Sequence, residues 1–372
     1  MKFIANSSTL VEHLQKISGT LVSKPTLPII ENFLFNVEKN KLSITSTDLE
    51  TTMTTFMNVE SDSKISVAVP SRLVIEILRT MPNLPITFTV DEKTNQVQLQ
   101  TEFGTYKLAG QDGKDFPKIP DTEFDSSFNI PSETLHDCIS KTIFATGNDE
   151  LRLNLTGVYV DLEEDKITFV STDANRLVKD ERTDVKPGVK HSFILPKKAL
   201  NLLKTTLSGS DSVVKVDYNR SNAFFAFGDT KLICRFVDER YPDYNAVIPI
   251  DNQNILIMNR EDLYNSVKRI SIFSNKSTHL IRIKIAGSSM SLSAEDFDMS
   301  NEADENISCE YNGEDMEIGF NSKLLLELLG SLECENIRFE LSAPNRAGVL
   351  FPVEKTEGEN ILMLIMPLML NN

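Results

Sequence analysis

The sequence has few of the residues on which enzymes rely for chemistry. Its four histidines, His13, His136, His191 and His279, are scattered, with no metal-ligand spacing and no nucleophile motif beside them. Neither GxGxxG nor GxxxxGK followed by Ser or Thr occurs, so nothing indicates a bound nucleotide. We therefore expect a protein without a catalytic site, a metal or a cofactor.

Cysteine and long apolar segments are also scarce. Cys138, Cys234, Cys309 and Cys334 lie far apart with no CxxC pair, which argues against a zinc site or a redox pair and predicts buried free thiols. No apolar run approaches the roughly 18 residues that a membrane helix needs, and the first residues lack the apolar core of a signal peptide. We expect a cytoplasmic protein that does not bind membranes.

Positive charge is in short supply. The 372 residues contain 38 Lys and Arg against 54 Asp and Glu, a formal net charge of -16. Taken as a whole, this charge argues against nucleic acid as a partner, because phosphate binding needs a positive face. With 40% apolar and 25% charged residues, the composition is that of a globular protein, and the length exceeds what one hydrophobic core usually supports. We expect two or three domains.

The sequence repeats itself three times. An alternating segment that ends in Asp occurs at residues 42–48, 167–173 and 290–296, with spacings close to one third of the chain. Each copy has the period of a strand with one buried face. The final residues, Asp48, Asp173 and Asp296, could be imagined as a metal site, but their equivalent positions put them in three different domains. Turn residues that close a strand are the favoured interpretation.

Two amphipathic helices accompany each repeat. We expect them at residues 7–19, 71–81, 132–142, 197–206, 260–271 and 321–331. Apolar residues recur in them at i, i+3, i+4 and i+7, as at Leu325 and Leu328, which is the pattern of a helix that packs on a sheet. Ser8, Ser132 and Asn259 are suitable N-caps for the helices that open the thirds.

Short alternating segments lie between the helices, punctuated by Asn, Asp and Gly. Most neighbours are joined without a helical crossover, which predicts antiparallel sheets and an α+β fold. Segments 116–120 and 241–249 carry prolines and end the first two thirds, and we interpret them as linkers. The expected domains are residues 1–121, 122–250 and 251–372, each with two helices packed on antiparallel sheets.

The positive charges are concentrated on the predicted helices. Together the helices have a small net positive charge, although the whole chain has -16. If they face one surface, that surface is mildly basic within an acidic body and can attract phosphates without reading bases. The alternative is that each cation is an ordinary solvated helix residue. The candidates for this surface are Arg72, Arg79, Lys197, Lys198, Lys204, Lys268 and Arg269.

Five stretches, taken in order, resemble the bacterial DNA sliding clamp family, the beta subunits of DNA polymerase III. They are residues 24–29, 171–177, 240–244, 316–321 and 365–370. The resemblance covers the whole chain and implies a head-to-tail homodimer whose similar domains close a ring around duplex DNA, with helices lining the hole. It also implies a non-catalytic processivity factor, independent of DNA sequence, that tethers DNA polymerase, the clamp loader and other proteins with a clamp-binding linear motif.

The same resemblance assigns residues to the ring. Those that would face or flank DNA are Lys24, Arg152 and Lys198. A salt bridge to the nearby Glu150 is the alternative role of Arg152. Ile272 and Phe273 would lie at the dimer interface, with buried core positions as the alternative.

Partners of the family dock a linear peptide in an apolar cleft between the second and third domains. The residues that the resemblance places there are Leu155, Thr172, Ala174, Asn175, Arg176, Leu177, Pro242, Val247, Asn321, Leu324, Met366, Pro367 and Leu368. Met and Leu suit a site that accepts related peptides. Ala174 and Asn175 stand where the family commonly has Gly-His. Segment 361–366 also reads as a last core strand, and we expect Leu364 to point inward.

A second hypothesis is a repeat-built, non-enzymatic protein that binds peptides without enclosing DNA. Such a protein would keep the apolar cleft and lose the charge bias of the helices.

Overall fold

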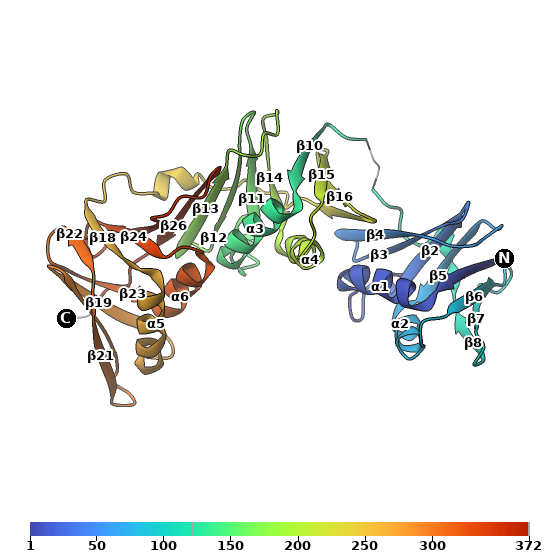
Figure 1. Cartoon of the computed structure of the whole chain (residues 1–372), viewed down its shortest axis with the longest axis horizontal. Helices are drawn as coiled ribbons and strands as arrows, with labels where there is room; N and C mark the ends of the chain where they lie inside the picture. Colours follow the sequence, from blue (N-terminus) through green and yellow to red (C-terminus); the bar gives the residue numbers. More distant parts are fainter. Residues whose placement is uncertain (121–122, 371–372) are drawn as a thin grey trace. The chain divides into compact units, whose positions relative to one another are not determined.

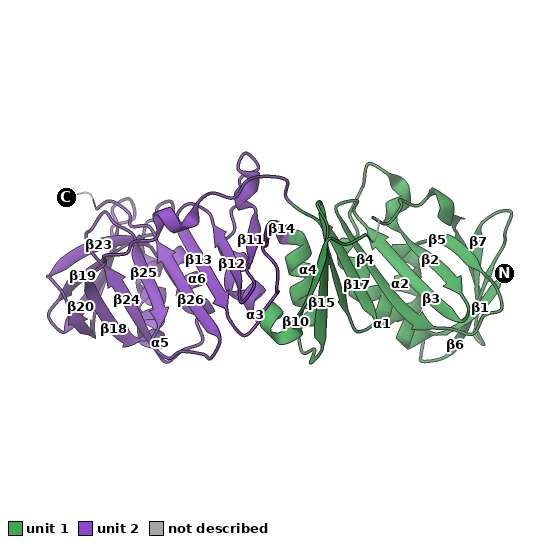
Figure 2. Ribbon diagram, turned by 90° about the horizontal axis from the view of Figure 1, so that it is seen from above, with its two compact units in different colours: residues 1–136, 198–236 green, residues 137–197, 237–372 purple. Residues whose placement is uncertain are grey.

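The computed structural model describes residues 1–120 and 123–370, which form two compact units. Unit 1 contains Met1–His136 and Lys198–Phe236, and unit 2 contains Asp137–Lys197 and Val237–Asn372 (Figure 2). Each unit has one nine-stranded and one four-stranded antiparallel sheet (Figure 1), so the expected α+β class is confirmed. The first expected domain boundary, between residues 121 and 122, lies outside the described residues.

The sheets of unit 1 combine strands from distant parts of the sequence. In spatial order, the larger sheet contains β10 (Ser126–Pro131), β15 (Val213–Tyr218), β16 (Asn222–Phe227), β17 (Thr230–Arg235), β4 (Thr51–Asn58), β3 (Lys41–Thr47), β2 (Asn32–Glu38), β5 (Ile65–Pro70) and β9 (Gln111–Asp112). The smaller sheet contains β1 (Lys2–Asn6), β6 (Pro85–Val90), β7 (Gln96–Gln100) and β8 (Thr105–Ala109).

Unit 2 has the same plan. Its larger sheet contains β14 (His191–Pro196), β11 (Gly157–Leu162), β12 (Ile167–Thr172), β13 (Arg176–Arg182), β26 (Glu359–Ile365), β25 (Gly348–Pro352), β24 (Asn336–Leu341), β18 (Asn254–Asn259) and β22 (Glu310–Asn312). Its smaller sheet contains β21 (Asn301–Ser308), β20 (Ser289–Asp296), β19 (Leu280–Ala286) and β23 (Met316–Asn321).

All six expected helices are present, with small differences at their ends. They are α1 (Ser7–Ile17), α2 (Ser71–Arg79), α3 (Ser132–Thr142), α4 (Lys197–Leu207), α5 (Arg260–Ile270) and α6 (Ser322–Ser331). The division between the units passes through α3 and falls at the start of α4. In the part of the chain that the structure describes, no helix is long and apolar enough to cross a membrane.

The helix caps test the sequence prediction at single residues. Asn259 caps α5 as expected, because its side chain accepts hydrogen bonds from two first-turn amides. For α1 the predicted Ser8 is wrong, since Asn6 is the cap and the amide of Ser8 donates to it. Ser132 is the first residue of α3, and its hydroxyl donates to the carbonyl of Ser210.

Apolar helix stripes form the cores of both units. In unit 1, Leu10 and Leu14 are fully buried, and the rings of Phe3 and Phe88 stack with centroids 4.6 Å apart. The third-repeat stripe that includes Leu325 is fully buried in unit 2. Each such side chain contributes roughly 1.5–3 kcal/mol on leaving water.

The structure also tests the predictions for the cysteines and for the repeated aspartates. Three cysteines are buried as expected, whereas Cys334 is half-buried. Asp48, Asp173 and Asp296 are turn residues, because each accepts a hydrogen bond from a backbone amide of the turn that follows it.

Each nine-stranded sheet joins two neighbouring repeats. In unit 1, β17 pairs with β4 and sets Cys234 opposite Thr51. In unit 2, β26 pairs with β13 and sets Ile365 opposite Arg176. Backbone hydrogen bonds make these junctions, so different side chains can share one architecture. Neighbouring repeats are thus connected by continuous sheet within each unit.

Unit 2 buries a group of charges next to its junction. Asp180 on β13 is fully buried, and no N–H or O–H donor within the described residues reaches its carboxylate. The ionisable groups around it are Cys138, Lys141, Arg182 and Glu359. Burial, reinforced by the charge of Glu359, raises the pKa of Asp180 to about 6 against the two cations.

Asp180→Asn is therefore expected to stabilise the protein at about pH 8. The folded pKa of about 6 exceeds the ordinary 3.8, so the ionised carboxylate opposes folding. This penalty is absent below about pH 4 and complete above about pH 7, where it is on the order of 3 kcal/mol. Urea unfolding across this range should show the parent losing stability as pH rises and the variant losing less.

Asp184→Asn is the matched control with the opposite sign. Hydrogen bonds from Arg182 lower the pKa of Asp184, so its removal should cost stability at neutral pH and little in acid. If the free energy of unfolding of the parent and of Asp180→Asn changed with pH in the same way, the account of Asp180 would be contradicted.

Candidate functional site

An apolar cluster lies on one face of the β13–β26 junction in unit 2. We call it the junction cluster; its buried members are Leu155, Val170, Leu177, Ile194, Tyr241, Ala347 and Leu364. Because side chains alternate along a strand, Leu364 points into this cluster whereas its neighbours Met363 and Ile365 point into the main core of unit 2. Leu177 and Leu364 are opposite each other in the register. The expected inward orientation of Leu364 is confirmed.

Three tyrosines hold the segment after β17 against this cluster. The rings of Tyr159 and Tyr241 stack with centroids 4.7 Å apart, and the ring of Tyr244 lies 6.0 Å from that of Tyr159. Burial raises the pKa of Tyr241 well above its usual value, so the hydroxyl stays neutral. Segment 241–249, predicted as a linker, is therefore packed on the sheet at its start.

Sequence reasoning did not assign these tyrosines to the site. Tyr241 and Tyr244 stand in a stretch that was interpreted through its prolines as a connection, and Tyr159 lies on a different strand. The available signal was the aromatic spacing itself, because two aromatics in a proline-marked segment favour packing over a free linker.

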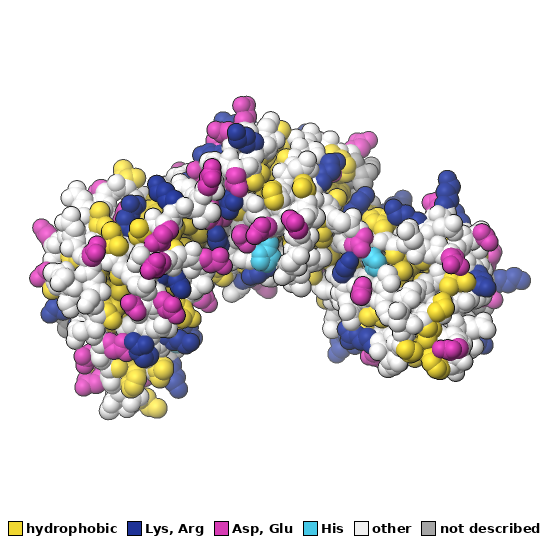
Figure 3. All heavy atoms as spheres, viewed as in Figure 1, with side chains coloured by type: hydrophobic (Ala, Val, Ile, Leu, Met, Phe, Trp, Pro, Cys, Tyr) yellow, Lys and Arg dark blue, Asp and Glu magenta, His cyan; other side chains and the backbone are white. Residues whose placement is uncertain are grey.

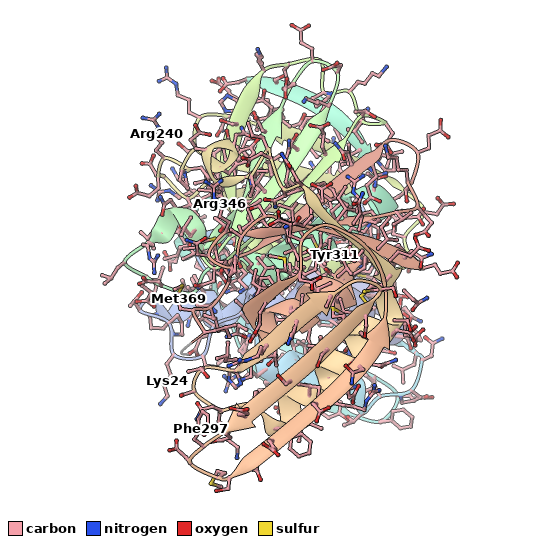
Figure 4. The ribbon with its side chains drawn as sticks, turned by 90° about the vertical axis from the view of Figure 1, so that its left-hand side faces the viewer. Lys24, Arg240, Phe297, Tyr311, Arg346 and Met369 are labelled. Atoms are coloured by element: carbon pink, nitrogen blue, oxygen red, sulfur yellow. The ribbon has the colours of Figure 1, made fainter. Side chains whose placement is uncertain are left out.

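The junction cluster has an apolar rim open to solvent. Val247, just before Ile248 that packs on the cluster, is 56% exposed, and Met366, just after β26, is 42% exposed. Pro242 is exposed next to the buried Tyr241. Figure 4 labels Arg240, Arg346 and Met369 of unit 2. Exposed apolar side chains beside a buried apolar cluster are typical of a protein-interaction site.

Some of the predicted cleft residues come together here. Leu155 and Leu177 are members of the junction cluster. The amide of Met366 donates to the carbonyl of Asn175 at 2.8 Å, which fixes the tail after β26 to the β12–β13 turn. The hydroxyl of Thr172 donates to the carbonyl at position 176 and closes the same turn.

Other predicted cleft residues have different surroundings. Leu368 pairs with Gly319 on β23, so the tail with Pro367 runs to the smaller sheet. Asn321 caps α6, and Leu324 packs against the main core of unit 2. These residues belong to the start of α6 and its sheet rather than to the junction cluster.

Arg176 acts by positioning its neighbours. Its side chain is only 7% exposed, its Nε lies 3.2 Å from Asp173 Oδ2, and its Nη2 donates to the carbonyl of Phe144 at 2.7 Å. It also pairs with Glu327 on α6. Ala174 in the same turn has φ of 76°, a left-handed conformation that favours the Gly common in the family and is strained for Ala.

The candidate cations, all of which lie on helices except Lys24 and Arg152, fall into two groups. Lys24, Arg72, Arg79, Lys204 and Lys268 are exposed or half-buried, and among the described residues no carboxylate lies within ion-pair distance of them. Figure 3 shows Lys and Arg interspersed with Asp and Glu on the displayed face. On that face, positive and negative side chains are therefore intermixed.

The remaining candidates have polar partners. Arg152 pairs with Asp149 at 2.9 Å, so the alternative of an ion pair is right in kind, although its partner is not Glu150. Lys198 pairs with Asp48, and Lys197 donates to the Asn148 side chain. Arg269 likewise makes two hydrogen bonds to Glu305.

Ile272 and Phe273 lie in a short 3-10 helix, η7 (Ser271–Phe273), that follows α5. They are 75% and 39% exposed. The alternative of buried core positions is therefore wrong, and two neighbouring apolar residues remain open to a partner.

Repeated α+β layers joined through continuous sheets define a clamp-type protein. Within residues 1–120 and 123–370, no group of His, Cys, Asp and Glu is placed to hold a metal ion. The features that stand out are the apolar junction cluster, the exposed cations and the sheet edges at β8 and β21.

Comparison with known proteins shows the family of this chain. Sequence models of the DNA polymerase III beta subunit match its N-terminal domain over residues 1–120, its central domain over 129–243 and its C-terminal domain over 245–369. The Beta sliding clamp of Proteus mirabilis is 30% identical over 344 residues, 92% of this chain and 93% of that protein. That of Vibrio cholerae is 29% identical over the full length of both.

Solved structures agree with this result. A DNA polymerase sliding clamp from Pseudomonas aeruginosa, solved with a ligand, matches all of both chains with a TM-score of 0.94 at 26% identity. The clamp from Bacillus subtilis has a TM-score of 0.95 at 22% identity, which shows the shared fold. The chain belongs to the DNA polymerase III beta subunit family, the bacterial beta sliding clamps. It is accordingly a non-catalytic processivity factor of DNA replication.

Proposed function

We propose that two copies of the chain close head to tail into a ring around duplex DNA, and that the junction cluster binds linear peptides of DNA polymerase, the clamp loader and other DNA enzymes. The ring would work in the cytoplasm, with domains at residues 1–121, 122–250 and 251–372 in each copy. One observation carries the proposal. Two strand junctions of the same kind exist within the chain, and the strands that would form the third lie at sheet edges.

We treat β8, β17 and β26 as equivalent strands of the three repeats because the same backbone pairing follows each of them. The residue that makes this pairing lies three positions after the residue at the strand junction. In every repeat this residue pairs with the strand that leads into the second helix. The pairs are Gln111–Ala68, Val237–Ile194 and Leu368–Gly319. Three positions before Gln111, Val237 and Leu368 stand Leu108, Cys234 and Ile365. Cys234 and Ile365 lie at the two internal junctions, so Leu108 is the equivalent residue of the first repeat.

The free edges complete the pattern. β8 and β21 are edge strands, so each has backbone donors and acceptors without a partner in its sheet. Transfer of the internal register sets Leu108 opposite Asn301, and Lys107 opposite Glu302, of a second copy. Two such junctions close a ring and leave neither edge free.

The position of Ile272 supports the same interface. Its equivalents are Gly19 in the first repeat and Phe144 in the second, and both lie at internal junctions. A Cβ at Gly19 would meet Leu202 on α4, and Phe144 packs against the core of unit 2 that includes Leu325 and Leu328 of α6. Ile272 and its neighbour Phe273 would accordingly face the second helix of the next domain, which for the third repeat is α2 of the other copy.

The helix cations suit a ring that slides on DNA. With a formal net charge of -16, most of the surface repels phosphates, so attraction is limited to the helices. The candidates for facing DNA are Lys24, Arg72, Arg79, Arg152, Lys197, Lys198, Lys204 and Lys268. Spread-out cations give a diffuse, salt-sensitive attraction without base readout, which permits movement along the duplex.

Retention on DNA tests enclosure directly. After loading with the cognate clamp loader and ATP, the protein is expected to stay on circular DNA through gel filtration and to be lost when the same DNA is linearised. A ring leaves DNA by sliding off a free end, whereas a protein bound to the DNA surface dissociates from circular and linear DNA alike. Equal release from both forms by a folded, loading-competent protein would favour the peptide-binding hypothesis without enclosure.

Charge exchange tests the register of the third junction. Lys107→Glu would place two carboxylates opposite each other at both junctions of the ring and should raise the dimer dissociation constant about tenfold. Adding Glu302→Lys should restore most of the affinity in sedimentation velocity. Lys64→Glu, at another exposed lysine, is the control. Failure of the second substitution to rescue would contradict this register.

Val247→Asp tests the junction cluster as the peptide site. A carboxylate on its apolar rim should weaken binding of the cognate replicative polymerase at least about tenfold, measured by surface plasmon resonance, because apolar contacts are lost. Val353→Asp is the matched control, since Val353 is also exposed and lies outside the cluster. Equal affinities of the two variants would rule out this site.

A further inference from the structure

The β20–β21 hairpin of unit 2 differs from its counterparts in the other repeats. The register pairs Asp296 with Asn301, which leaves residues 297–300 in the turn. In the first repeat the amide of Asp48 already bonds the carbonyl of Thr51, so that turn is shorter by two residues. The β12–β13 turn has the shorter form as well. The extra length is confined to the third repeat.

The longer turn carries large apolar side chains. Phe297 is 86% exposed and Met299 is 64% exposed, and Figure 4 marks Phe297 at the free end of the hairpin. Turn formation does not explain them, because Gly, Asn, Asp and Ser supply turn geometry without exposing apolar surface. Exposed apolar side chains of this kind are typical of a surface that binds an apolar partner.

The shorter turns show what a turn at this place contacts. In unit 1, Asp48 forms an ion pair with Lys198, the second residue of α4. In unit 2, Arg176 next to the β12–β13 turn pairs with Glu327, the sixth residue of α6. Both turns therefore rest on the second helix of the following repeat, on one helix face, because positions 2 and 6 are one turn apart.

The corresponding helix for the third repeat is α2. Arg72 and Glu76 occupy its positions 2 and 6, and both are exposed. Leu73, three residues before Glu76 and therefore its neighbour on the helix surface, is 48% exposed, an apolar residue beside a charged face. Its exposure is unexplained within the chain and complements the exposed tip.

We propose that the Phe297–Met299 tip of one copy packs on Leu73 of α2 in the second copy, as an apolar latch at the ring junction. This inference rests on the proposed ring and adds to it a contact that the strand register does not require. Burial of two large side chains on a leucine removes apolar surface of both copies from water. The latch sits at the end of β21, where opening of the junction would begin by separating the strand from β8.

The latch is tested by single and paired substitutions, with the dimer dissociation constant measured by sedimentation velocity on the full chain. Phe297→Asp and Leu73→Asp should each raise it about tenfold or more. The pair Phe297→Asp with Leu73→Lys should bring it back to within about threefold of the parent, because the new charges would attract each other. Val213→Asp, at another exposed apolar residue whose exposure lies between those of Leu73 and Phe297, should leave the dissociation constant unchanged.

The outcomes separate the latch from the ring. If Lys107→Glu weakens the dimer while Phe297→Asp behaves like Val213→Asp, the latch is wrong and the ring stands. If Phe297→Asp weakens the dimer and Leu73→Asp does not, the tip contacts another surface and the assignment to α2 is wrong. If neither Lys107→Glu nor Phe297→Asp has an effect, the third junction itself is wrong.

Discussion

Antiparallel backbone pairing between strands of neighbouring repeats is the interaction on which this structure depends. It makes β17–β4 in unit 1 and β26–β13 in unit 2, and it is independent of side-chain identity. Side chains can therefore vary at equivalent positions without loss of the architecture. The pair next to the first junction is Thr52 with Ile233, and the pair next to the second is Leu177 with Leu364. Only the second pair is wholly apolar, and both of its residues belong to the apolar junction cluster.

The same separation of backbone and side-chain roles reconciles an acidic protein with DNA. The sheets need no particular charge, so the excess of negative residues can occupy strands and loops while the helices keep a small net positive charge. Several of those cations are already neutralised, as Lys198 is by Asp48 and Arg269 by Glu305. The attraction that remains is weak and diffuse. A protein that must stay on DNA through its topology has no need of more.

Much of the fold could be predicted because its signals are local and repeated three times. Helix and strand periods identified the six helices and the strands that end in the repeated aspartates. What failed depended on contacts between distant residues. The packing of segment 241–249 requires Tyr159 from another strand, the burial of Arg176 requires Glu327 from the next repeat, and the group around Asp180 requires β26. At the site, Leu155 and Leu177 were placed correctly, whereas Asn321 and Leu324 have their contacts around α6.

Amide hydrogen exchange on the edge strands tests the central claim, that the third junction repeats the other two, most directly. In a dimer, the amides of Thr105–Ala109 and Asn301–Ser308 that point away from their own sheets should be protected, and dilution to monomers should speed their exchange about tenfold or more. Amides at β17–β4 and β26–β13 should stay protected in both states. Exchange at β8 and β21 that is equally fast in dimer and monomer would contradict the account.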